Sequence, residues 1–142
     1  MVFENCVSVP AFFYAASRMD AIIVPINARL TDAELERIFA HSDPSVVMFS
    51  TDVSEAANAH ADNFGAEKVT GSFGEAALMR REGADAEPVF ADGREQVALM
   101  LYTSGTTGTP KAAMLTPGHL NSAALAPGQI PGRRAHRASA PA

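Results

Sequence analysis

The sequence lacks several features that point to particular classes of protein. It has no tryptophan and one cysteine, Cys6, so neither an intramolecular disulfide nor a cysteine-based zinc cluster is expected. Its apolar runs, such as residues 21–26, are far shorter than the ~18 residues that a membrane-spanning helix needs. No basic stretch precedes the first apolar residues, which argues against a signal peptide. We therefore expect a cytoplasmic protein without an integral membrane segment.

Acidic residues are absent from the last third of the chain. All sixteen Asp and Glu residues lie within residues 1–95, together with seven of the eleven bases, whereas residues 96–142 hold the other four bases. The formal net charge of -5 disfavours general binding to nucleic acid or to an anionic membrane. A local anion-binding site near the C-terminal end is compatible with this distribution.

The C-terminal segment also differs in composition. From Gly118 onward, seven of the residues are Ala, three are Pro and three are Gly, and no amphipathic period continues after Ala126. We predict that residues 1–117 form the folded part of the chain. Residues 118–142 are predicted to form a disordered tail rich in Ala, Pro, Gly and Arg.

An amphipathic helix followed by a buried strand is predicted at the start of the chain. Over residues 8–20, apolar side chains repeat at helical spacing, namely Val9, Phe12, Phe13 and Ala16. Ser8 is the expected N-cap, and the apolar face is expected to pack on a sheet. The apolar, β-branched run 21–26 predicts a buried strand.

A capping box marks a second helix. Thr31 and Glu34 match the pattern in which the threonine side chain accepts from the backbone and the glutamate reaches back to the N-cap. Leu35, Ile38, Phe39 and Ser42 continue at helical spacing and predict an apolar face. The Asp43-Pro44 pair is expected to end the helix. A buried strand is predicted at residues 46–49.

The rest of the chain continues to alternate between helices and strands. We predict a helix over residues 53–64, a strand around 68–69, a short helix around 75–81, and strands at 96–102 and 112–115. Alternating elements with short connections predict an α/β fold with a mainly parallel sheet and flanking helices.

A polar segment lies between the last two predicted strands. Residues 103–111 contain five hydroxyl side chains, two glycines and one lysine. Glycines let backbone N–H groups turn toward an anion, hydroxyls donate hydrogen bonds, and Lys111 supplies a positive charge. The segment is not a Walker A loop, because Pro110 precedes the lysine and a strand follows it. The composition predicts a phosphate-binding loop, with an ordinary exposed turn as the alternative.

The order of these residues resembles a known family signature. The run Tyr102-Thr103-Ser104-Gly105-Thr106-Thr107-Gly108-Thr109-Pro110-Lys111, followed by Met114-Leu115-Thr116, is similar to the phosphate loop of the adenylate-forming enzymes, which include the acyl-CoA synthetases. Residues 14–19, 21–31 and 34–35 resemble the N-terminal part of fatty-acyl-CoA ligases. The resemblance covers residues 3–121. Members of this family run to several hundred residues. The resemblance therefore implies that residues 1–117 form a partial AMP-binding (adenylation) domain, which is an early portion of the family's fold.

The resemblance implies a two-step reaction. In the family, a carboxylate such as a fatty acid attacks the α-phosphate of Mg·ATP to give an acyl-adenylate and pyrophosphate, and coenzyme A then displaces AMP. The implied cofactors are ATP, Mg²⁺ and CoA. The β- and γ-phosphates would be held by Thr103, Ser104, Gly105, Thr106, Thr107, Gly108 and Lys111. The resemblance assigns no catalytic residue and no metal ligand to this chain.

The chain also departs from the family pattern. Asp20 and Ala112 stand where the family has glycine, and the family's adenine-binding, ribose-binding and C-terminal lysine motifs have no counterpart. We therefore expect a truncated acyl-CoA synthetase that is not catalytically competent by itself. Two alternatives are a small ATP- or phosphate-binding module without ligase chemistry, and an inactive product that associates through exposed sheet edges.

Two histidines, His41 and His60, lie near predicted helix ends. No cysteine or second histidine stands at the spacing of a metal site. We therefore expect both rings to lie at solvated helix ends and predict no metal site.

Overall fold

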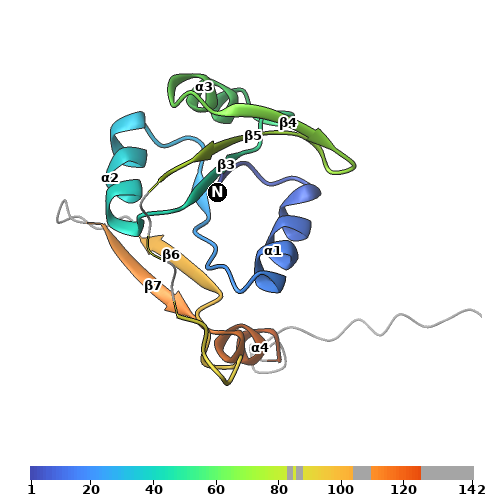
Figure 1. Ribbon diagram of the computed structural model, residues 1–142, viewed down its shortest axis with the longest axis vertical. Helices are drawn as coiled ribbons and strands as arrows, with labels where there is room; N and C mark the ends of the chain where they lie inside the picture. The colour runs from blue at the N-terminus through green and yellow to red at the C-terminus, as the bar shows by residue number, and fades with distance from the viewer. Residues whose placement is uncertain (83–84, 86–87, 104–109, 126–142) are drawn as a thin grey trace, which may run out of the picture.

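The computed structural model describes residues 1–82, 85, 88–103 and 110–125, which form two sheets and four helices (Figure 1). The helices are α1 (Ser8–Arg18), α2 (Asp32–Ser42), α3 (Glu55–Asn63) and α4 (Pro117–Leu125). The strands are β1 (Val2–Phe3), β2 (Ile26–Asn27), β3 (Val46–Phe49), β4 (Glu67–Gly71), β5 (Gly74–Arg80), β6 (Leu99–Thr103) and β7 (Lys111–Leu115). The predicted α/β class is confirmed.

The larger sheet is mixed rather than mainly parallel. Its strand order is β2-β1-β3-β5-β4, in which β1 runs parallel to β2 and β3, whereas β5 runs antiparallel to both β3 and β4. The antiparallel part arises because β4 and β5 form a tight hairpin in which Gly71 pairs with Gly74. Such a short connection joins only antiparallel strands. Gly74 has a φ of 99°, a conformation that glycine adopts without strain.

The prediction of a short helix around residues 75–81 is wrong, because this segment forms strand β5. Its Glu-Ala-Ala-Leu-Met-Arg sequence has good helix propensity, but pairing with β3 on one side and β4 on the other overrides that preference. Ala76 and Ala77 are buried as a result. The strand predicted at 21–26 is also reduced, to an isolated bridge at Ile23 and the two residues of β2.

The hydrophobic core lies between the larger sheet and helices α2 and α3. Its buried residues are Val2, Ile26, Ala28, Leu35, Ile38, Phe39, Val47, Phe49, Ala57, Ala61 and Ala77. The ring of Phe64 packs against Phe39 and Phe49, with centroid distances of 5.4 and 6.3 Å. Leu35, Ile38 and Phe39 all come from the predicted apolar face of α2, so that part of the sequence pattern is confirmed.

Helix α1 is less buried than predicted. None of its residues is buried. The apolar side chains that were expected to pack on a sheet, Val9, Phe12, Phe13 and Ala16, are only half-buried. Phe12 meets Phe73 of the β4–β5 turn edge to face, with ring centroids 5.3 Å apart. The N-cap is Val7 rather than Ser8, because the helix begins at Ser8 itself and no side chain caps it.

The capping box that starts α2 is confirmed. The Thr31 side chain accepts from the Glu34 backbone N–H at 3.4 Å, and a Glu34 carboxylate oxygen accepts from the Thr31 backbone N–H at 2.8 Å. The same carboxylate oxygen accepts the Thr31 hydroxyl proton at 2.8 Å. At the other end, Asp43 adopts the left-handed conformation with a φ of 38°, which ends the helix before Pro44.

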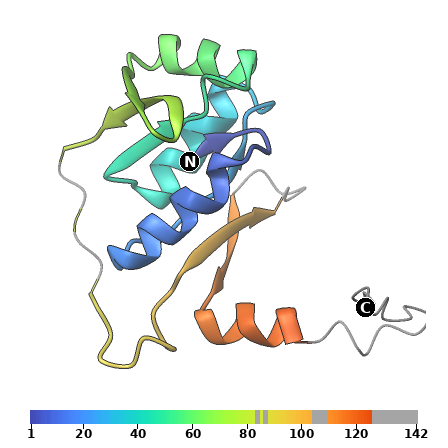
Figure 2. The same ribbon diagram turned by 90° about the vertical axis from the view of Figure 1, so that its right-hand side faces the viewer.

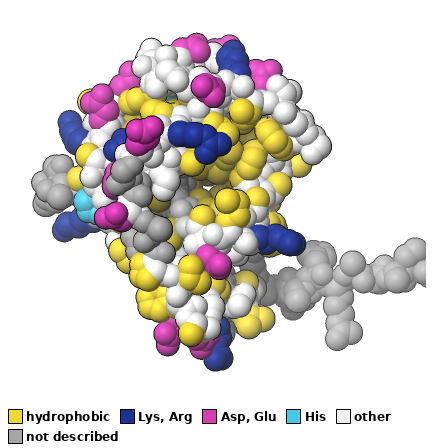
Figure 3. Space-filling view, viewed as in Figure 1, with side chains coloured by type: hydrophobic (Ala, Val, Ile, Leu, Met, Phe, Trp, Pro, Cys, Tyr) yellow, Lys and Arg dark blue, Asp and Glu magenta, His cyan; other side chains and the backbone are white. Residues whose placement is uncertain are grey.

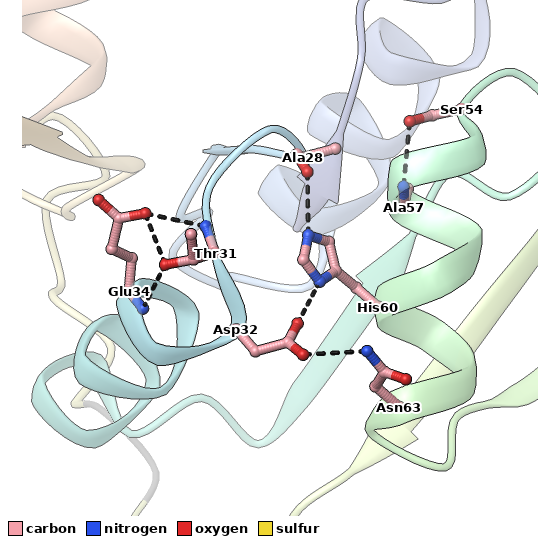
Figure 4. A network of polar contacts seen from close by, with 8 residues as sticks. All are labelled: Ala28, Thr31, Asp32, Glu34, Ser54, Ala57, His60 and Asn63. Atoms are coloured by element: carbon pink, nitrogen blue, oxygen red, sulfur yellow. Dashed lines mark hydrogen bonds and ion pairs between the residues drawn. The ribbon is translucent and has the colours of Figure 1, made fainter.

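A polar network joins α2, α3 and the turn after β2 (Figure 4). His60 places Nδ1 2.5 Å from Asp32 Oδ1 and Nε2 2.9 Å from the Ala28 carbonyl oxygen. Asn63 donates to the other Asp32 oxygen at 2.9 Å. His60 is only 8% exposed, so the prediction of a solvated ring is wrong here. The ring is enclosed because α3 packs against the first turn of α2.

Strands β6 and β7 form a separate antiparallel hairpin. Both views place this hairpin and α4 at the end of the molecule opposite α3 (Figures 1 and 2). Its backbone is joined to the rest of the described chain by a parallel bridge between Ile23 and Leu99. Two hydrogen bonds make this bridge, from Ile23 N–H to the Ala98 carbonyl at 3.1 Å and from Met100 N–H to the Ile23 carbonyl at 2.8 Å.

Helix α4 occupies the first part of the segment that was predicted to be disordered. Thr116 caps it, because its hydroxyl accepts from the His119 N–H at 3.3 Å while His119 Nδ1 accepts from the Thr116 N–H at 3.2 Å. Pro117 follows the cap, at the position where proline suits a helix. Residues 118–125 of the predicted tail are thus helical in the structure, and residues 126–142 lie outside the described residues.

Hydrophobic side chains remain exposed in several places. Figure 3 shows them around a hollow between the upper part of the molecule and its lower part. The most exposed large ones include Val7, Tyr14, Met19, Met114 and Leu125. In the described part of the chain, no helix is both long and apolar enough to cross a membrane.

The capping box generates a first prediction. Thr31→Ala is expected to lower the free energy of unfolding by about 1 kcal/mol at neutral pH, because the N-cap hydroxyl is lost. Thr31→Ser keeps a hydroxyl and is the matched control. Urea denaturation of the three proteins measures the difference, and an equal loss in both variants would contradict the role of the hydroxyl.

The pH dependence of that difference follows from Glu34. Hydrogen bonds from the backbone and then the hydroxyl of Thr31 hold the pKa of the Glu34 carboxyl below its ordinary value of 4.5. A carboxyl with a lowered folded pKa stabilises the fold above its unfolded pKa, and this stabilisation is lost as the pH falls through the folded value. The gap between wild type and Thr31→Ala should therefore be constant from pH 5 to 7 and should shrink below about pH 4.5.

The buried network generates a second prediction. His60→Ala is expected to lower the free energy of unfolding by about 1–3 kcal/mol, because the Asp32 carboxylate and the Ala28 carbonyl lose a partner. Asn58→Ala, on the same helix but outside the network, is the control and should change stability by less than about 0.5 kcal/mol. A loss of the same size in both variants would show that the network adds nothing beyond ordinary helix packing.

Candidate functional site

The β6–β7 hairpin positions the two ends of the predicted phosphate loop. Thr103 is the last residue of β6 and Lys111 the first residue of β7, and the two are register partners across the hairpin. The structure thus brings together the first and last of the seven predicted site residues, which lie eight positions apart in the sequence. The other five, Ser104, Gly105, Thr106, Thr107 and Gly108, lie outside the described residues.

The loop end of this hairpin is exposed and favours an anion. Thr103 and Lys111 are both exposed. Within the described residues, Lys111 forms no ion pair, since the four pairs present involve other side chains. The sequence has no acidic residue after Glu95, so no carboxylate close in the chain competes for the lysine. A hydroxyl and an ammonium side by side can bind a phosphate group.

Tyr102, at the base of the loop, is anchored to α2. Its hydroxyl is hydrogen-bonded to His41 Nδ1 at 2.6 Å, and the two rings meet edge to face with centroids 5.6 Å apart. The Tyr102 side chain also packs against the hydrophobic core. Burial raises the pKa of the Tyr102 hydroxyl above its ordinary value of 10.0, so this group stays protonated at neutral pH.

His41 is the residue near the site that sequence reasoning missed. It is exposed, as a residue at a helix end is expected to be, but its ring contacts Tyr102, which lies 61 positions further along the chain. Nothing in the local sequence pattern pairs residues so far apart. His60, the other histidine considered, serves the buried network between α2 and α3.

A concave region lies at the N-terminus of α3. It is an open pocket of about 520 Å³, lined by Thr51, Asp52, Val53, Ser54, Glu55, Asn58, Ala59 and Asp62. Three of these are carboxylates, which disfavour phosphate. Among the described residues, no group of three or more His, Cys, Asp or Glu side chains is arranged to hold a metal ion. The hairpin is therefore the better candidate for binding ATP.

Comparison with known proteins decides the family. The model of the family described as AMP-binding enzyme matches residues 1–137. The chain belongs to the AMP-binding enzyme family. This result confirms the resemblance inferred from the sequence and extends it beyond residue 121, into the predicted tail. The family match implies the use of ATP at the level of the AMP-binding enzymes as a whole.

Several curated acyl-CoA ligases are similar to this AMP-binding chain. The long-chain-fatty-acid–CoA ligase FadD13 of Mycobacterium tuberculosis is 36% identical over 129 residues, which are 87% of this chain and 25% of FadD13. A feruloyl-CoA synthase of Amycolatopsis sp. is 35% identical over 75% of this chain and 20% of its own length. The indoleacetate–CoA ligase of Aromatoleum aromaticum is 35% identical over 78% of this chain and 23% of its own length.

The chain spans about a quarter of the length of these curated relatives. Their names share the formation of a CoA thioester and differ in the acid, which is a long-chain fatty acid, ferulate or indoleacetate. Membership of the AMP-binding enzymes is thus shown, whereas similarity to these relatives does not identify the acid substrate of this chain.

The exposure of Lys111 generates a third prediction. Lys111→Ala is expected to change the free energy of unfolding by less than about 0.5 kcal/mol, because the side chain is exposed and forms no ion pair among the described residues. Thermal denaturation followed by circular dichroism measures this change. A loss of several kcal/mol would mean that the lysine serves the fold, and the variant would then be unsuitable for binding tests.

Proposed function

We propose that this chain supplies the phosphate-binding hairpin of an ATP-dependent, AMP-forming acyl-CoA ligase. The observation that carries the proposal is the pairing of Thr103 with Lys111 at the exposed end of β6–β7, in a chain that belongs to the AMP-binding enzymes. In this function, Thr103, Ser104, Gly105, Thr106, Thr107, Gly108 and Lys111 bind the β- and γ-phosphates of Mg·ATP.

The proposed chemistry is electrostatic. A carboxylate attacks the α-phosphate, the acyl-adenylate forms, and negative charge moves onto the departing pyrophosphate. Lys111 and the hydroxyl donors of the loop stabilise that charge. The thiol of coenzyme A then displaces AMP and gives the acyl-CoA. No residue of this chain is proposed as a nucleophile or as a general base.

A fatty acid is the proposed carboxylate. The likeness to a long-chain-fatty-acid–CoA ligase over 87% of the chain supports it, and the ferulate and indoleacetate named in other relatives are the competing acids. The lone Cys6 and the absence of a disulfide pair in the sequence fit a reducing cytoplasm, where we propose that the reaction takes place.

A second candidate is Mg·ATP binding without ligase chemistry. The observation that favours it is the Thr103–Lys111 pair at the loop end of the hairpin, which requires only that the hairpin bind phosphate. Both candidates require the 142-residue chain to bind Mg·ATP. They differ in pyrophosphate release with a fatty acid present, for which we expect no turnover by this chain alone.

The lysines provide a sharp fourth prediction. The sequence has two, Lys68 on β4 and Lys111 on β7, and both are exposed. Lys111→Ala is expected to weaken Mg·ATP binding about tenfold or more, because a charged hydrogen bond to phosphate is lost. Lys68→Ala is the matched control and should leave the affinity within about twofold. Isothermal titration calorimetry at two salt concentrations measures both, and the wild-type affinity should fall at the higher salt.

Two results would contradict the proposal. One is the absence of saturable Mg·ATP binding by the folded wild-type chain. The other is an equal loss of affinity in Lys68→Ala and Lys111→Ala, which would indicate a general effect of charge.

A further inference from the structure

The hairpin that carries the loop is held to the rest of the described chain at two points. At the end remote from the loop, the Ile23–Leu99 bridge joins the backbones. At the end near the loop, the contact is made by Tyr102, whose ring packs against the core and whose hydroxyl meets His41. Tyr102 directly precedes Thr103, so this second point lies one residue from the start of the loop.

His41 is itself held firmly. It lies in the last turn of α2, two residues after the buried Phe39. The capping box fixes the first turn of this helix, and three buried side chains fix its face against the core. The backbone at His41 therefore belongs to a rigid element, whose position relative to the sheet is set by the core rather than by the hairpin.

The partner strand transmits the position of Tyr102 across the hairpin. Tyr102 pairs with Ala112, and the next pair toward the loop is Thr103 with Lys111. Adjacent residues along a strand are about 3.3 Å apart. A shift of the β6 backbone at Tyr102 would therefore also shift the backbone positions of Thr103 and Lys111.

We infer that His41 is a positioning residue, which through the Tyr102 hydroxyl fixes the end of β6 from which the phosphate-binding loop begins. The inference rests on the proposed function for its effect on ATP. It goes beyond that function because His41 contacts neither Thr103 nor Lys111 and lies outside every motif of the resemblance. The inference assigns the positioning of β6 to the hydrogen bond between His41 and Tyr102, rather than to the packing of the Tyr102 ring.

A double-mutant cycle on the 142-residue chain tests the inference. Tyr102→Phe keeps the ring and removes the hydroxyl, and His41→Ala removes the other partner. Each is expected to weaken Mg·ATP binding about fivefold, and the double variant should lose far less than twenty-five-fold, because both single variants break the same hydrogen bond between His41 and Tyr102. His41→Gln retains a hydrogen-bonding side chain and should restore the affinity to within about twofold of wild type.

The second tyrosine provides the control. The sequence has two tyrosines, and Tyr14 is 75% exposed on α1. Tyr14→Phe should leave Mg·ATP affinity unchanged. Independent losses that multiply in the double variant, or wild-type affinity in His41→Ala, would overturn the inference.

Hydrogen–deuterium exchange keeps this test separate from that of the proposed function. In the absence of nucleotide, His41→Ala and Tyr102→Phe should each speed exchange of the β6 amides about fivefold, whereas the amides of β3 and Tyr14→Phe should be unaffected. If wild type binds no Mg·ATP, the proposed function fails, and this measurement still decides whether His41 holds the hairpin. Unchanged exchange in β6 would overturn the inference by itself.

Discussion

The placement of α2 on the larger sheet is the constraint on which the candidate site depends. Leu35, Ile38 and Phe39 bury one face of this helix in the core that β1 and β3 share with α3. Burial of such side chains is the main source of stability in a small domain. Because the helix is fixed at this face, its last turn presents His41 at a defined position beside β6.

The polar contacts refine this placement. The capping box satisfies the first backbone N–H groups of α2, and the His60–Asp32 contact ties the same turn to α3. Buried polar groups are tolerated only when they have partners, and here both ring nitrogens of His60 face an oxygen. The network therefore ties α3 to the first turn of α2 and to the turn after β2 through both ring nitrogens of His60.

The hairpin and α1 contrast with this well-packed region. Helix α1 has no buried residue, and Met114 of β7 is 60% exposed. Exposed hydrophobic side chains of this kind favour association with another apolar surface. Association of this chain through exposed sheet edges was expected from the sequence, and it remains a prediction.

The sequence by itself determined the elements whose signals are local. The capping box, the apolar face of α2, strand β3 and the last two strands were predicted because each depends on residues a few positions apart. The loop composition and its order were enough to identify the family, which the family match confirms. Of the seven predicted site residues, Thr103 and Lys111 are described, and their pairing across the hairpin follows from the two predicted strands.

Only the tertiary structure decided the features that depend on distant partners. Strand β5 was predicted to be a helix, because pairing with β3 and β4 is not visible in its own sequence. The burial of His60 and the contact of His41 with Tyr102 join residues 28 and 61 positions apart. Side chains so far apart in the chain meet only when the core has assembled, so no local pattern of charge or hydrophobicity records their contact.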